Sequence, residues 1–122
     1  MFKKVAFTMY PVEDLERARA FYENTLKLPL SKISAGGGWI EYDLPGGGCL
    51  AITNMVPELT PSANAGGTIA FEVDALDDLV ERLKKDGVKF KLDTYISPVC
   101  KMAVILDSEG NSVILHQLHP KS

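Results

Sequence analysis

Residues 66–79 read GGTIAFEVDALDDL, and residues 5–18 read VAFTMYPVEDLERA. In both stretches a short apolar run leads through a valine into a segment that begins with acidic residues and a leucine. Aligning the two at an offset of 61 residues superposes valine on valine and leucine on leucine, and it places Phe7 on Thr68. A strand-to-helix transition that occurs twice at a fixed offset indicates an internal duplication, which determines the whole fold.

Each copy continues as an amphipathic helix. In the second copy Asp74 is the predicted N-cap and Gly87 the left-handed C-cap. The apolar stripe between them follows the i, i+3, i+4, i+7 spacing and consists of Leu76, Leu79, Val80 and Leu83. In the first copy Asp14 is the predicted N-cap, and the stripe consists of Leu15, Ala18, Tyr22 and Leu26.

Three strand-like runs follow each helix. They lie near residues 29–34, 38–44 and 49–54 in the first copy, and near 88–96, 100–107 and 112–118 in the second. The sequence therefore predicts an α+β fold of two consecutive βαβββ modules. We expect one domain over residues 1–122, with module 1 at 1–56, a Pro- and Gly-rich linker at 57–66 and module 2 at 67–122.

Composition excludes several classes of protein. With 46% hydrophobic and 24% charged residues the chain is globular, and no apolar run approaches the roughly 20 residues of a membrane span. The net charge is -3 and no Lys/Arg cluster occurs, so neither a nucleic acid nor a membrane is an expected partner. The N-terminus lacks the features of a secretory signal, and we expect a cytoplasmic protein.

The arrangement resembles the vicinal oxygen chelate superfamily, which includes glyoxalases, extradiol dioxygenases, fosfomycin-resistance thiol transferases and bleomycin-resistance proteins. The motifs that carry the resemblance are the strand exit at 12–17 with Phe21 and Tyr22, the strand at 69–73 with Gly87 after its helix, and the turn at 107–111. The resemblance implies that the two curved sheets form a cup, that enzymes hold a divalent metal at its base, and that the protein is a homodimer.

The metal-ligand positions of this family hold His, Gln or Glu on the first and last strand of each module. In this sequence they correspond to Phe7, Ala51, Thr68 and Ile114. Three of these side chains have no donor atom, and an uncharged hydroxyl is a poor ligand for such ions. We therefore expect no metal and no other cofactor.

Period-two alternation then predicts the lining of the cup. The predicted ligand-binding residues are Phe7, Met9, Trp39, Glu41, Ala51, Thr68, Glu72, Met102, Val104, Ile114 and His116. Such mostly apolar walls with a few polar groups are typical of a small-molecule pocket. Phe7 and Ile114 alternatively fill the cup or pack across a dimer interface, and Trp39 serves either as a lid or as an interface anchor.

Four functions remain open at this point. The leading one is metal-independent binding of a small, partly hydrophobic molecule, similar to bleomycin-resistance-type sequestration or carrier proteins. The second is a metal-dependent lyase or oxidoreductase of the glyoxalase or dioxygenase kind. The third is a metal-free enzyme in which His116 or Glu41 moves a proton, although either residue is also compatible with a surface role. The fourth is an interaction module whose cup is filled.

Overall fold

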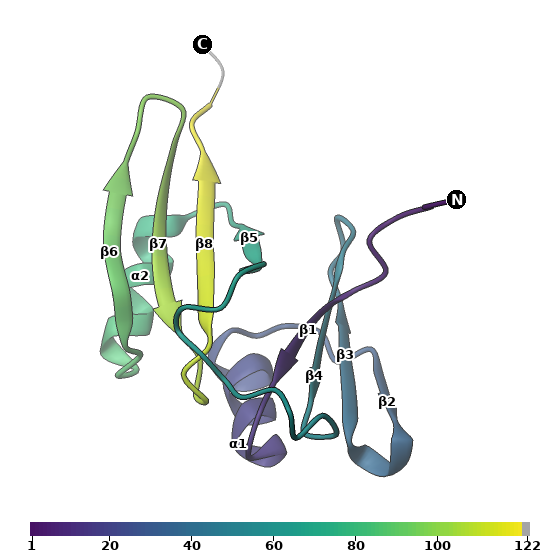
Figure 1. The fold of residues 1–122 in the computed structure, drawn as a ribbon. Coiled ribbons are helices and arrows are strands. Elements are labelled where there is room, and N and C mark those ends of the chain that lie inside the picture. Colours follow the sequence, from purple (N-terminus) through teal and green to yellow (C-terminus); the bar gives the residue numbers. More distant parts are fainter. Residues whose placement is uncertain (121–122) are drawn as a thin grey trace. The chain divides into compact units, whose positions relative to one another are not determined.

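The computed structural model describes residues 1–120 and divides into two compact units, Met1–Pro61 and a second unit that starts at Ser62. The boundary lies inside the segment predicted as a linker. Figure 1 shows that each unit contains one sheet with a helical segment against one of its faces.

The first unit is a βαβββ module. Its elements are β1 (Thr8–Pro11), α1 (Leu15–Arg19) continued by the π-helical turn η1 (Ala20–Thr25), β2 (Lys32–Ser34), the short 3-10 turn η2 (Ala35–Gly37), β3 (Trp39–Asp43) and β4 (Cys49–Thr53). The four strands lie in the order β1-β4-β3-β2, with β1 parallel to β4 and the other pairs antiparallel.

The second unit repeats this topology. Its elements are β5 (Ala70–Glu72), α2 (Leu76–Lys85), β6 (Phe90–Ile96), β7 (Cys100–Leu106) and β8 (Ser112–Leu118). The strand order is β5-β8-β7-β6, again with the first strand parallel to the last. The predicted α+β fold of two βαβββ modules is confirmed, and the duplication extends to strand order and direction.

Strand register also agrees between the units. Met9 pairs with Ala51 in the first unit, and Ala70 pairs with Ile114 in the second. Ala51 and Ile114 are therefore equivalent positions, as the alignment of the two copies required.

Helix ends were predicted with mixed success. The Asp14 carboxylate accepts a hydrogen bond from Arg17 N at 3.0 Å, which confirms the first N-cap. Asp74 was the wrong N-cap for α2: Ala75 occupies that position without a side-chain cap. Gln117, from β8, supplies the missing acceptor, because its Oε1 takes a hydrogen bond from Leu76 N at 2.9 Å. Gly87 has a φ of +80° and ends α2 as expected.

The core of each unit lies between the sheet and its helix. In the first unit it consists of fully buried Tyr22, Ile40, Tyr42, Leu50 and Ile52, and in the second of Leu76, Leu83, Ile105, Val113 and Leu115. The core residues that belong to strands occupy alternate positions, so the intervening residues project from the opposite face of each sheet. That opposite face carries the predicted site residues.

Candidate ligand-binding site

Strand pairing brings the predicted residues of the second unit together on one face of its sheet. Ile114 on β8 lies between Ala70 on β5 and Val104 on β7. Two residues further along the strands, His116 lies between Glu72 and Met102. Because directly paired residues point to the same side of a sheet, these side chains share a face, opposite the face that packs on α2.

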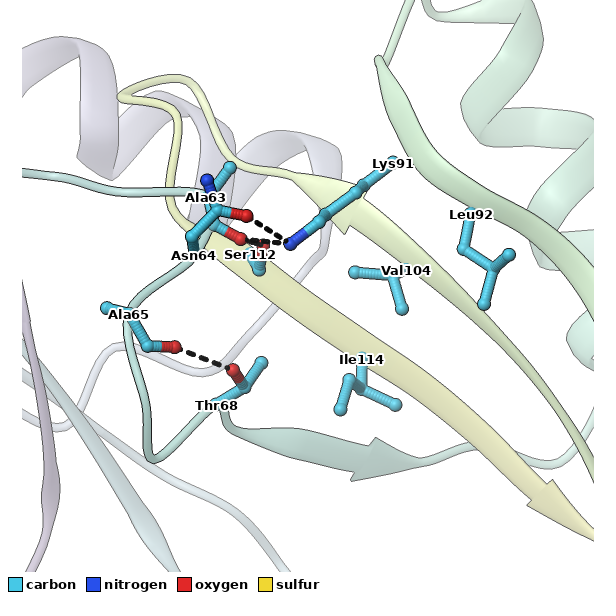
Figure 2. A pocket seen from close by; sticks show the side chains of 9 residues that line it. All are labelled: Ala63, Asn64, Ala65, Thr68, Lys91, Leu92, Val104, Ser112 and Ile114. Atoms are coloured by element: carbon cyan, nitrogen blue, oxygen red, sulfur yellow. Dashed lines mark hydrogen bonds between the residues drawn. The ribbon is translucent and has the colours of Figure 1, made fainter.

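A pocket of about 460 Å³ opens on this face (Figure 2). Its apolar wall consists of Leu92, Val104 and Ile114. Two hydroxyl groups, those of Thr68 and Ser112, and the ammonium of Lys91 supply the polar groups, and the segment 63–65 closes one side. The pocket thus includes three of the predicted residues, Thr68, Val104 and Ile114.

The segment 63–65 is fastened to the sheet by the turn between β7 and β8. Ser62 N donates to Asn111 Oδ1 at 3.1 Å, and Ser112 Oγ donates to the carbonyl oxygen of Ala63 at 2.6 Å. Asn111 is itself held, because its Nδ2 donates to Asp107 Oδ2 at 3.0 Å. Part of the predicted linker therefore forms a fixed wall of the pocket.

Lys91 and Leu92 were not predicted as site residues, although both line the pocket. Phe90 pairs with Ile105 and Leu92 pairs with Val104, so two steps on β6 match one step on β7. Lys91 is the extra residue of this β-bulge, and a bulge interrupts the alternation of faces on which the sequence argument relied. Two consecutive residues can then contribute to one site.

Glu72 and His116 form a hydrogen-bonded pair further along the same face. His116 Nδ1 lies 2.6 Å from Glu72 Oε1, and the other carboxylate oxygen accepts a hydrogen bond from Leu118 N at 2.8 Å. The hydrogen bond with His116 and the one from the Leu118 amide lower the pKa of the Glu72 carboxyl. A carboxylate in this place fixes the orientation of the imidazole ring.

The remaining predicted residues cluster in the first unit. Phe7 and Trp39 make an edge-to-face contact with ring centroids 5.1 Å apart, and Trp39 Nε1 donates to Glu41 Oε2 at 2.7 Å. Ala51 is fully buried between its strand partners Met9 and Glu41. The aromatic and carboxylate groups of this cluster therefore contact one another.

Comparison with protein families gives one decisive match. Residues 4–114 match the model of the glyoxalase/bleomycin resistance protein/dioxygenase superfamily. The chain belongs to this superfamily. No curated protein sequence matches the chain.

Several solved structures share the fold of this chain. A putative glyoxalase family protein from Bacillus anthracis has a TM-score of 0.81 at 18% identity, with 98% of each chain covered. TnmS3, an antibiotic binding protein from Streptomyces sp. CB03234, has a TM-score of 0.79 at 24% identity, covering 97% of this chain and 98% of its own. A glyoxalase/bleomycin resistance protein from the same organism has a TM-score of 0.73 at 25% identity, covering 89% of this chain and 96% of its own.

The residues at the four positions predicted to correspond to the superfamily's metal ligands do not fit a metal ion. Phe7, Ala51 and Ile114 offer no donor atom, and divalent ions of this kind require several nitrogen, oxygen or sulfur donors. The Thr68 hydroxyl lies in the loop before β5 and donates to the carbonyl oxygen of Ala65 at 3.4 Å. A single hydroxyl with a local partner does not replace the missing ligands.

A different group of donors lies in the first unit. Glu41, Asp43 and Cys49 place one donor atom each within 4.8 Å of one another, the only such group found in residues 1–120. Burial and the nearby carboxyl groups of Asp43 and Glu41 raise the pKa of the Cys49 thiol to about 11. Without a bound metal ion the thiol is therefore protonated at neutral pH.

No helix in the part of the chain that the structure describes is long and apolar enough to cross a membrane.

Proposed function

We propose that this protein binds a small, partly hydrophobic molecule, without a metal ion, in the pocket bounded by Thr68, Lys91, Val104, Ser112 and Ile114. The pocket itself is the observation that carries the proposal. Its volume of about 460 Å³ lies in the range of small-molecule sites. An apolar wall of aliphatic side chains with a few polar groups is the usual composition of such sites.

Membership of the superfamily and the name of one relative support this function. TnmS3 is described as an antibiotic binding protein, and its fold matches almost the whole of this chain. We infer that the present protein also binds an organic compound, for sequestration or transport rather than for metal-dependent conversion.

Native mass spectrometry of the purified protein tests both parts of the proposal. In the mass spectrum we expect no stoichiometric metal. In separate measurements, addition of EDTA should change neither the melting temperature of the protein nor its affinity for an organic ligand. One divalent ion per chain would contradict metal independence. In that case Cys49→Ser would report whether the ion is held by the donor group of Glu41, Asp43 and Cys49, since the substitution removes its only sulfur.

The hydrogen bond between His116 and Glu72 favours a second function, metal-free proton transfer. With Nδ1 directed at the carboxylate, Nε2 is the nitrogen that can exchange a proton with a bound molecule. If turnover of any compound is found, His116→Gln should abolish it while binding in the pocket persists. Turnover that survives this substitution would exclude His116 as the proton-transferring group.

We also propose that the protein forms a homodimer. Tyr95, Ile96, Val99 and Leu118 are between 57% and 68% exposed at one end of the β6–β8 sheet. Apolar side chains and the free edge of β6 make this region suitable for association. Light scattering coupled to size exclusion should give twice the mass of the chain, and Ile96→Lys should shift it toward the monomer.

A further inference from the structure

The proposed pocket has an asymmetric distribution of charge. Lys91 is the only ionisable side chain in its lining, and no carboxylate lines it among the residues that the structure describes. The Lys91 ammonium donates to the carbonyl oxygen of Ala63 and, at 2.9 Å, to Asn64 Oδ1. Both partners are neutral oxygens, so they orient the ammonium without compensating its charge.

The ammonium retains capacity for a ligand. It carries three N–H donors, of which the contacts with Ala63 and Asn64 use two. Figure 2 shows the Lys91 nitrogen directed toward segment 63–65, close to Ser112, while Val104, Leu92 and Ile114 form the apolar part. A molecule in this pocket would meet a fixed positive charge at one end and an aliphatic surface along the rest.

We propose that the ligand is an organic anion, an apolar ring system that carries a carboxylate or phenolate, and that Lys91 recognises the anionic group. This inference rests on the proposed function and specifies its ligand class. A charge-assisted hydrogen bond to an ammonium is stronger than a bond between neutral groups. The bulge in β6 is the feature that allows Lys91 to take this position beside Leu92.

The test compares 2-naphthoate with 2-naphthamide, which have the same ring and differ in charge. Binding is measured by NMR titration, with the amide signals of Val104, Ser112 and Ile114 locating the site. We expect naphthoate to bind the wild-type protein about tenfold more tightly than naphthamide, with the preference falling as salt is raised. Lys91→Met should reduce the affinity for naphthoate to that for naphthamide and leave the latter unchanged.

Two further variants separate charge from structure. Lys91→Arg keeps the charge and should retain the preference, which guards against a loss caused by loosening of segment 63–65. Lys89→Met removes the same charge from an exposed lysine outside the lining and should behave as wild type. Equal affinity of the wild-type protein for both compounds, or a preference that persists in Lys91→Met, would overturn the anion inference and leave the binding function standing. Failure of both compounds to perturb the pocket signals at millimolar concentration would overturn both.

Discussion

Replacement of Asn111 by alanine should destabilise the second unit and open its pocket. Asn111 is 4% exposed, and its side chain joins two parts of the chain. The amide nitrogen donates to the Asp107 carboxylate at 3.0 Å, and the amide oxygen accepts from Ser62 N at 3.1 Å. The substitution removes both bonds, whereas the backbone bonds of the same turn do not depend on the side chain.

The expected loss follows from the two bonds. A hydrogen bond to a charged group contributes about 1.5–3 kcal/mol and a neutral one about 0.5–1.5 kcal/mol. Asn111→Ala should therefore reduce the free energy of unfolding by about 2–4 kcal/mol, measured by urea denaturation followed by circular dichroism. Asn24→Ala, the same change at an exposed site of η1, is the control and should stay within about 0.5 kcal/mol of wild type.

Hydrogen exchange makes the test specific to the pocket wall. The amide of Ser62 should exchange faster in Asn111→Ala, since its acceptor is gone, and the affinity of the pocket for 2-naphthoate should fall. A change in unfolding free energy below about 0.5 kcal/mol, together with unaltered exchange at Ser62, would refute the view that Asn111 fastens this segment.

Three other predictions concern the helices and turns around the site. Gly87→Ala should reduce the free energy of unfolding, measured by thermal denaturation, by about 1 kcal/mol, because φ at this residue is +80°. An added Cβ would meet no atom within 4 Å at Gly87 or at Gly66, so Gly66→Ala, where φ is not positive, is the control and should be near neutral. Tyr42→Phe should cost about 1–3 kcal/mol in urea denaturation at neutral pH, because the buried hydroxyl donates to Glu23 Oε2 at 2.8 Å. Hydrogen bonds from Arg19 and Tyr42 lower the pKa of Glu23, so their stabilising effect is present above the ordinary pKa of a glutamate and is lost as the pH falls through the lowered value. The penalty of Tyr42→Phe should accordingly be smaller near pH 2 than at neutral pH, and an equal penalty at both would contradict this account.

The fold could be predicted because duplication doubles every local signal. A short strand such as β5 is ambiguous by itself, but its equivalence with β1 at a fixed offset identifies both. Helix caps were less predictable, because their partners need not be local. Asp14 uses a neighbour three residues away, whereas α2 takes its acceptor from Gln117, 41 residues further along the chain. A residue so distant leaves no pattern near the helix start.

The candidate site was predicted in part for a similar reason. Alternation correctly places Val104, Ile114 and His116 on one face of the second sheet, because β7 and β8 pair without interruption. Alternation cannot find Lys91, since the bulge in β6 breaks the period at that residue. It also cannot find segment 63–65, which has no regular structure and is positioned by Asn111 and Ser112.

The two units show why the repeat specifies the fold but not the site. The position before the first strand of each unit holds Phe7 in the first unit and Thr68 in the second. On the third strand of each unit, the equivalent position holds Glu41 in the first and Val104 in the second. In the first unit the larger and polar side chains contact one another through Trp39. In the second unit the side chains at these positions are smaller and leave space. The bulge in β6 and segment 63–65 form the sides of this space. The pocket therefore arises from the differences between two copies of one module. A substitution that makes these positions alike should impair anion binding: Val104→Glu would place a carboxylate on the wall of the pocket and oppose the anion that Lys91 is proposed to bind.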